Sequence, residues 1–137
     1  MKFHKNRTRH NRRAVAAVEL AVTIPILTMI TLGTIEASGM IFLQQSIEIA
    51  AHEGARVALV PSTRATNAIA ASNEVLSSRN IDGTTVTVTP SDFENRPYGT
   101  FIKVTVTASC DANAKFSPWF YQGKTLVAEV EMMKETD

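Results

Sequence analysis

Residues 14–35 form a run of 22 residues that is apolar at almost every position. The only charged residue within it is Glu19, and Glu36 follows directly after its end. At ~1.5 Å per helical residue, the helix between these two glutamates is about 26 Å long, close to the ~30 Å hydrocarbon core of a bilayer. The run therefore predicts a transmembrane helix with one carboxylate near each membrane interface.

The helical pattern continues beyond the apolar run without a breaker until Pro61. Small and apolar residues recur there at spacings of three and four, which predicts a stripe on which a sheet or a second helix can pack. The residues of this stripe are Ile47, Ala50, Ala51, Gly54 and Ala58. A second, amphipathic helix is predicted over residues 62–80, with Ile69, Val75 and Leu76 facing inward and a turn signal after it.

Three later runs, residues 84–89, 100–109 and 125–133, alternate with a period of two and are rich in β-branched residues. They predict a three-stranded antiparallel meander with one face on the helices. The expected inward residues are Val86, Val88, Ile102, Val104, Val106, Leu126, Ala128, Val130 and Met132. The predicted fold class is therefore α+β, in which a long N-terminal transmembrane helix extends into a small exported domain with a second helix and this sheet.

The connection before the last strand contains an aromatic cluster. Its members are Phe116, Trp119, Phe120 and Tyr121, and Trp119 is the only tryptophan of the chain. Such a cluster is more often a lid over one end of a small core than a ligand site, and we expect a lid here.

The basic residues are distributed very unevenly. Residues 1–13 carry six of the 14 Lys and Arg residues and none of the 13 acids, although the formal net charge of the chain is only +1. By the positive-inside rule, the N-terminus stays in the cytoplasm and the rest is exported. We therefore expect a basic cytoplasmic leader at residues 1–14, a transmembrane helix at 15–43 and an extracytoplasmic domain at 44–137. A nucleic-acid partner is not expected, because no aromatic ladder, zinc-ligand set or partner fold accompanies the basic segment.

Candidate chemistry is sparse. A length of 137 residues excludes a large multidomain enzyme, and the single cysteine, Cys110, excludes a disulfide framework or a multi-thiolate zinc site. His52 lies beside Glu48 and Glu53, but a histidine on a polar helix face is usually solvated. The H-E-x-x-H, G-x-S-x-G and P-loop motifs do not occur. We expect no enzymatic activity, no cofactor and no metal site.

The segment RRAVAAVELAVTIPILTMITLGTIEASGMIFLQQSIEIAAHEGARVALV resembles the N-terminal region of the TadE-like family, the minor pilins or pseudopilins of tight-adherence type IV pilus systems. The resemblance is carried by two arginines before a small residue, a glutamate five positions on, a proline within the span, an Ile-Glu pair near its end and a final Ala-Ala-x-Glu-Gly-Ala-Arg. These are Arg12, Arg13, Ala14, Glu19, Pro25, Ile35, Glu36 and residues 50–56. The KFSPWF segment and the last strand resemble the C-terminal region of the family more loosely.

The resemblance implies processing by a membrane prepilin peptidase. The cut would fall on the cytoplasmic side between Ala14 and Val15, although glycine is typical of the family where this chain has Ala14. It would remove the six positive charges and leave Glu19 at mature position five. The new amine at Val15 of a neighbouring subunit would then neutralise Glu19 and set the axial register between packed helices.

The function that the resemblance implies is a structural or assembly component of a tight-adherence pilus or related secretion system, which serves adhesion or secretion. Its partners would be the membrane, other pilin or pseudopilin subunits, the prepilin peptidase and the pilus assembly machinery. Its location would be the bacterial inner (cytoplasmic) membrane, with the N-terminus in the cytoplasm, and the surface pilus.

Two alternatives stand beside this interpretation. One is a single-pass anchored binding or sensory domain outside the cytoplasm, in which Glu19 is incidental. The other is a secreted soluble protein behind a cleavable signal peptide, although the apolar run is longer than the 7 to 15 residues of a signal-peptide core and lacks an A-x-A site.

Overall fold

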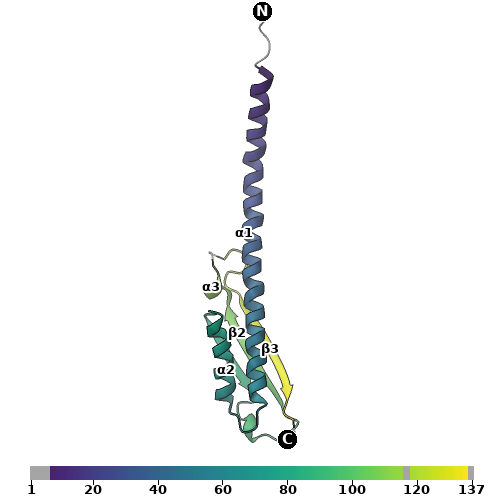
Figure 1. Ribbon diagram of the computed structural model, residues 1–137, viewed down its shortest axis with the longest axis vertical. Helices are drawn as coiled ribbons and strands as arrows, with labels where there is room; N and C mark the ends of the chain where they lie inside the picture. The colour runs from purple at the N-terminus through teal and green to yellow at the C-terminus, as the bar shows by residue number, and fades with distance from the viewer. Residues whose placement is uncertain (1–6, 116–117, 136–137) are drawn as a thin grey trace, which may run out of the picture. The chain divides into compact units, whose positions relative to one another are not determined.

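The computed structural model describes residues 7–115 and 118–135 (Figure 1). The elements in chain order are α1 (Arg7–Ala58), α2 (Ala65–Ser78), β1 (Thr84–Thr89), the 3-10 helix η1 (Phe93–Asn95), β2 (Phe101–Ser109), α3 (Cys110–Asn113) and β3 (Thr125–Met133). The chain divides into two compact units, Met1–Ile35 and Glu36–Asp137, and α1 contributes residues to both.

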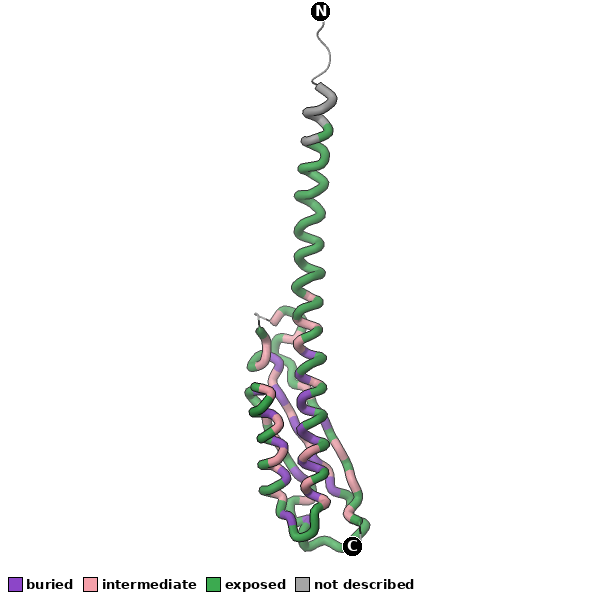
Figure 2. The backbone as a smooth tube through the Cα atoms, viewed as in Figure 1, coloured by how far each residue is buried: buried purple, intermediate pink, exposed green. Residues whose placement is uncertain are grey.

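The first unit consists of the N-terminal part of α1, whose side chains face outward in every direction. All residues from 14 to 32 are exposed, as the uninterrupted green stretch of Figure 2 shows. Among the described residues, one helix, Ala14–Ala58, is long and apolar enough to cross a membrane, and its most apolar window is not buried within the protein. A helix that is apolar on all sides and uncovered by its own chain fits membrane anchoring.

The hydroxyl groups of this apolar helix find partners within the helix itself. Thr23 Oγ1 donates a hydrogen bond of 2.7 Å to the carbonyl of Glu19, and Thr28 Oγ1 donates one of 2.9 Å to that of Ile24. Thr31 and Thr34 make the same bond to the fourth residue before them. Since a lipid core offers no water to a hydroxyl, these internal bonds make the threonines compatible with a membrane span.

The second unit contains the three-stranded sheet, in the order β1-β2-β3 with both pairs antiparallel. The predicted meander is confirmed, and β2 begins at Phe101, one residue later than expected. Ile102, Val104 and Val106 of the central strand are buried, whereas Val130 and Met132 of the outer strand β3 are only partly buried. The outer strands have a neighbour on one side only, so their inward residues keep more contact with solvent.

One face of this sheet is covered by α2 and by the part of α1 that belongs to the second unit (Figures 1 and 2). The predicted small-residue stripe of α1 is confirmed, because all five of its residues are buried. The stripe continues toward the N-terminus through Met40 and Leu43, which are also buried. α1 therefore buries one narrow face in this unit.

Helix α2 is shorter than predicted, and of its predicted inward residues Leu76 is confirmed as buried. It covers Ala65–Ser78, and Ser62 and Asn80 outside its ends have φ angles of 63° and 54°, in the left-handed region that interrupts a helix. Its buried residues are Ala68, Ser72 and Leu76. The predicted inward residues Ile69 and Val75 are only partly buried, because small side chains occupy the centre of the contact with α1.

The closest approach of the two helices is at Gly54. A Cβ atom at this position would overlap Ser72 Oγ and would lie 3.2 Å from the carbonyl oxygen of Ala68 and 3.3 Å from Val104 Cγ1. Glycine is therefore required here because a larger side chain would not fit. Its backbone is not in the left-handed region that often demands glycine. The contact fixes α1 against both α2 and β2.

We predict that Gly54→Ala lowers the free energy of unfolding by about 1–3 kcal/mol, since overpacking outweighs the gain of up to ~1 kcal/mol in helix propensity. Gly39→Ala is the matched control on the same helix, because among the described residues no atom from beyond its own stretch of helix lies within 4 Å of its Cβ position. Adding Ser72→Ala to Gly54→Ala should restore part of the loss. The measurement is denaturant unfolding of the detergent-solubilised chain by circular dichroism, and equal stability of Gly54→Ala and Gly39→Ala would refute the packing argument.

Candidate functional site

The predicted site residues Ala14, Val15 and Glu19 lie on α1 in the first unit, and all three are exposed. Arg12, Val15, Ala16 and Glu19 line one shallow depression on the helix surface, so they share a face. Val15 and Glu19 are four residues apart, a rise of ~6 Å along the axis. An amine created at Val15 would therefore lie on the same side of the helix as the carboxylate of Glu19.

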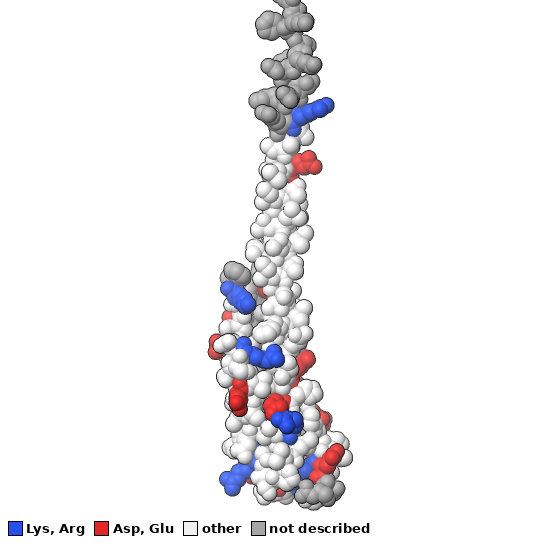
Figure 3. Space-filling model, viewed as in Figure 1, with Lys and Arg blue, Asp and Glu red and all other residues white. Residues whose placement is uncertain are grey.

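Charge is confined to one end of the apolar run, because residues 20–35 carry no charged side chain. In the view of Figure 3, charged side chains are scattered over the second unit, whereas the apolar run of the first unit is nearly uniform and uncharged. Of the six basic residues of the expected leader, the structure describes the side chain of Arg12. Residues 1–6 of that leader lie outside the described part of the chain.

Glu36 concentrates several polar contacts on one carboxylate oxygen in the second unit. Its Oε1 atom accepts three backbone N–H bonds, from Trp119 at 3.0 Å, Phe120 at 2.9 Å and Tyr121 at 2.9 Å. Three successive N–H groups that converge on one carboxylate oxygen form an anion-binding nest. We call this set of three hydrogen bonds the Glu36 clasp, and it ties the loop before β3 to α1.

A second carboxylate holds the other end of the same loop. Both carboxylate oxygens of Asp111 accept the backbone N–H of Gly123, at 3.1 and 3.0 Å. The amide of Cys110 donates to the carbonyl of Lys124 at 2.9 Å, and the Lys124 ammonium lies 5.2 Å from the ring centroid of Tyr121. The loop is therefore fixed by two carboxylates from two different helices.

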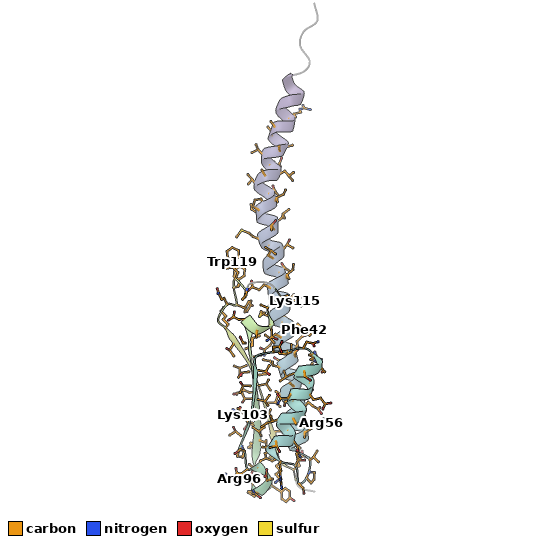
Figure 4. All side chains as sticks on the ribbon, turned by 90° about the vertical axis from the view of Figure 1, so that its left-hand side faces the viewer. Phe42, Arg56, Arg96, Lys103, Lys115 and Trp119 are labelled. Atoms are coloured by element: carbon orange, nitrogen blue, oxygen red, sulfur yellow. The ribbon has the colours of Figure 1, made fainter. Side chains whose placement is uncertain are left out.

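The aromatic residues of this loop do not form the predicted lid. Trp119 and Phe120 are 65% and 60% exposed, and their ring centroids are 5.7 Å apart. Tyr121 alone packs partly against the core, and Phe116 lies outside the described residues. The prediction was wrong for Trp119 and Phe120 because the Glu36 clasp fixes the backbone beneath them and leaves both rings outside the core. We call these two residues the aromatic tip, and Figure 4 shows Trp119 directed away from the second unit.

From the sequence, Glu36 was recognisable as the charge that bounds the span and as part of the Ile-Glu pair of the resemblance. Its role could not be identified from the residues of the loop, because the clasp uses backbone amides that every non-proline residue carries. The available signal was indirect, since a lone carboxylate after an apolar run requires a partner or water. No motif indicated that residues 83 to 85 positions away would supply that partner.

The remaining candidate residues are His52 with the carboxylates beside it, and Cys110. His52 is exposed, and the carboxylates near it are engaged, Glu48 with Gln44 at 2.8 Å and Glu53 with Arg56 Nε at 2.9 Å. Within the described residues, no group of three or more His, Cys, Asp or Glu side chains is arranged to hold a metal ion. Cys110 is buried, and this burial raises the pKa of its thiol, with a further increase from the nearby charge of Asp111.

Comparison with known proteins finds a family match that covers nearly all of α1. The model of a protein family described as TadE-like protein matches residues 14–56. The match confirms the resemblance over this segment, and it supports a membrane component associated with the tight-adherence pilus system. No curated protein and no solved structure matches the chain.

Proposed function

We propose that this chain is a minor pilin or pseudopilin of a tight-adherence pilus or a related secretion system, a structural or assembly component without catalytic activity. The observation that carries the proposal is the family match over residues 14–56. This segment begins at the proposed cleavage site and contains Glu19, Glu36 and the stripe as far as Gly54. All of these lie on one helix, α1.

The proposed topology follows from charge and length. The basic leader keeps residues 1–14 in the cytoplasm, and the helix from Val15 onward crosses the bacterial inner membrane. The prepilin peptidase then cuts between Ala14 and Val15 on the cytoplasmic side. The domain with α2 and the sheet lies outside, where it can meet other pilin subunits, the assembly machinery and the surface pilus.

The assembly step depends on Glu19. The apolar surface of the first unit is as compatible with lipid tails as with other apolar helices, so apolar burial alone does not choose between the two. A charged side chain within a bilayer costs on the order of 2.5–3.5 kcal/mol at the centre and less toward the interface. The amine at Val15 of a neighbouring subunit removes this cost by pairing with Glu19, and the pairing selects one axial register.

The exposure of Val15 and Glu19 supports this proposal, because both groups are open to a neighbouring helix. Their shared face also means that one subunit offers an acceptor and a donor on the same side. Two such helices can therefore pair along one face when they are displaced along the axis.

We predict that Glu19→Ala and Glu19→Gln both lower the number of pili per cell by about tenfold or more, since a loss of about 1.4 kcal/mol at a subunit contact lowers its association constant tenfold. Pili and surface adhesion are counted in cells with equal amounts of the protein in the membrane. Glu74→Ala is the matched control, because Glu74 is an exposed carboxylate of α2 in the second unit. Unchanged piliation in both Glu19 variants would favour the anchored binding or sensory domain instead.

We predict that Ala14→Gly leaves the processed product unchanged and raises its rate of formation, whereas Ala14→Leu leaves the full chain of 137 residues uncut. The reason is steric, because a pocket shaped for glycine tolerates one methyl group better than a branched side chain. Mass spectrometry of the mature N-terminus measures both outcomes. Ala21→Leu, an exposed position further along α1, should be processed like the parent.

If Ala14→Leu is cut as fast as the parent, Ala14 is not the recognised position, and Glu19 is not mature residue five. A mature N-terminus well beyond the apolar run would instead identify a secreted protein with a signal peptide.

A further inference from the structure

The aromatic tip has no role in the function proposed so far. Trp119 and Phe120 are large, adjacent and mostly exposed, while the backbone that carries them is held by the Glu36 clasp and by Asp111. Adjacent exposed apolar side chains that form one patch mark an interaction surface, whereas singly scattered ones do not.

The Glu36 clasp determines beside which residue of α1 the aromatic tip is held. Glu36 is covalently joined to the last residue of the apolar run, and its carboxylate is within 3.0 Å of the amides of residues 119–121. The aromatic tip is therefore held at the level of the helix where the apolar run ends. If residues 14–35 cross the bilayer, that level is the outer membrane–water interface.

The chemistry of the tip suits such an interface. Tryptophan is enriched at the headgroup level because its ring is largely apolar and its N–H can reach a polar partner. Lys115 and Lys124 flank the loop, and both are exposed. Figure 4 places Trp119 and Lys115 at the same end of the second unit, and Arg96 at the opposite end. Cationic side chains beside an aromatic pair match the anionic headgroups of a lipid surface.

We propose that the aromatic tip inserts into the outer interface of the same bilayer that α1 crosses, and that the Glu36 clasp positions it there. The inference rests on the membrane anchoring in the proposed function and is independent of pilus assembly. It places the membrane boundary at Glu36, within the 15–43 span expected from the sequence. The exported domain is then held to the membrane at two points, by its helix and by Trp119 and Phe120.

The test uses the full chain inserted in vesicles of phosphatidylethanolamine and phosphatidylglycerol, with Trp119 as the intrinsic probe because it is the only tryptophan. Its fluorescence is measured with aqueous acrylamide and with phospholipids brominated either high or low on the acyl chain. We expect weak quenching by acrylamide and stronger quenching by the shallow bromines than by the deep ones.

The matched control carries Trp119→Phe and Tyr98→Trp, which moves the probe to a side chain that is 59% exposed and close to Arg96. We expect this probe to be quenched several-fold more by acrylamide than Trp119 is, and not at all by brominated lipid. Resistance of the protein to alkaline extraction is measured in the same vesicles to establish that the helix is inserted.

Equal acrylamide quenching of the two probes in inserted protein overturns the inference and leaves the anchoring intact. Protection of Trp119 from acrylamide without quenching by brominated lipid also overturns it, because a protein surface then covers the tip. Release of the protein by alkali overturns the proposed anchoring and, with it, the inference.

Discussion

The carboxylate of Glu36 accepts hydrogen bonds from three backbone amides at the residue where the second unit begins. Residues 20–32 of the helix are uncharged and exposed on every side, and after Glu36 the helix buries one face in a small core. Hydrogen bonds to an ionised acceptor are stronger than those between neutral groups, so one side chain can fix a loop 83 to 85 residues away. The position of residues 119–121 and the outward direction of Trp119 depend on this contact.

The packed part of α1 faces a different constraint, since it must touch both a helix and a sheet. Its buried face therefore consists mainly of small residues, and at Gly54 even a methyl group finds no space. The same requirement determines which side of α2 is buried, because Ala68 and Ser72 fit against Gly54 where Ile69 would not. One helix thus combines a surface for lipid or other helices with a face for close intramolecular packing.

Patterns that arise from local periodicity could be predicted from the sequence. Residue spacing alone predicts the stripe of α1 and the strands Thr84–Thr89 and Thr125–Met133. In each of them the more buried positions recur with the period of the helix or the strand. Leu76 of α2 was predicted to be buried, but the burial of Ala68 and Ser72 was not, since it depends on the close approach at Gly54 rather than on hydrophobicity. The Glu36 clasp was also missed, because backbone amides carry no sequence signal. The roles of Ala14, Val15 and Glu19 stay predictions, because each requires a second molecule.

The central claim is that Glu36 holds the loop that carries the aromatic tip. Amide hydrogen exchange of Trp119, Phe120 and Tyr121 tests it most directly, measured by NMR on the full chain in nanodiscs and compared with Val104 and Val106 of β2. We expect Glu36→Ala to accelerate exchange of the three loop amides about tenfold or more, since a hydrogen bond to a charged group contributes about 1.5–3 kcal/mol, while the β2 amides are unchanged. Glu48→Ala, which removes a carboxylate further along α1, should leave all five amides as they are. Equal exchange of the loop amides in the parent and in Glu36→Ala would contradict the account.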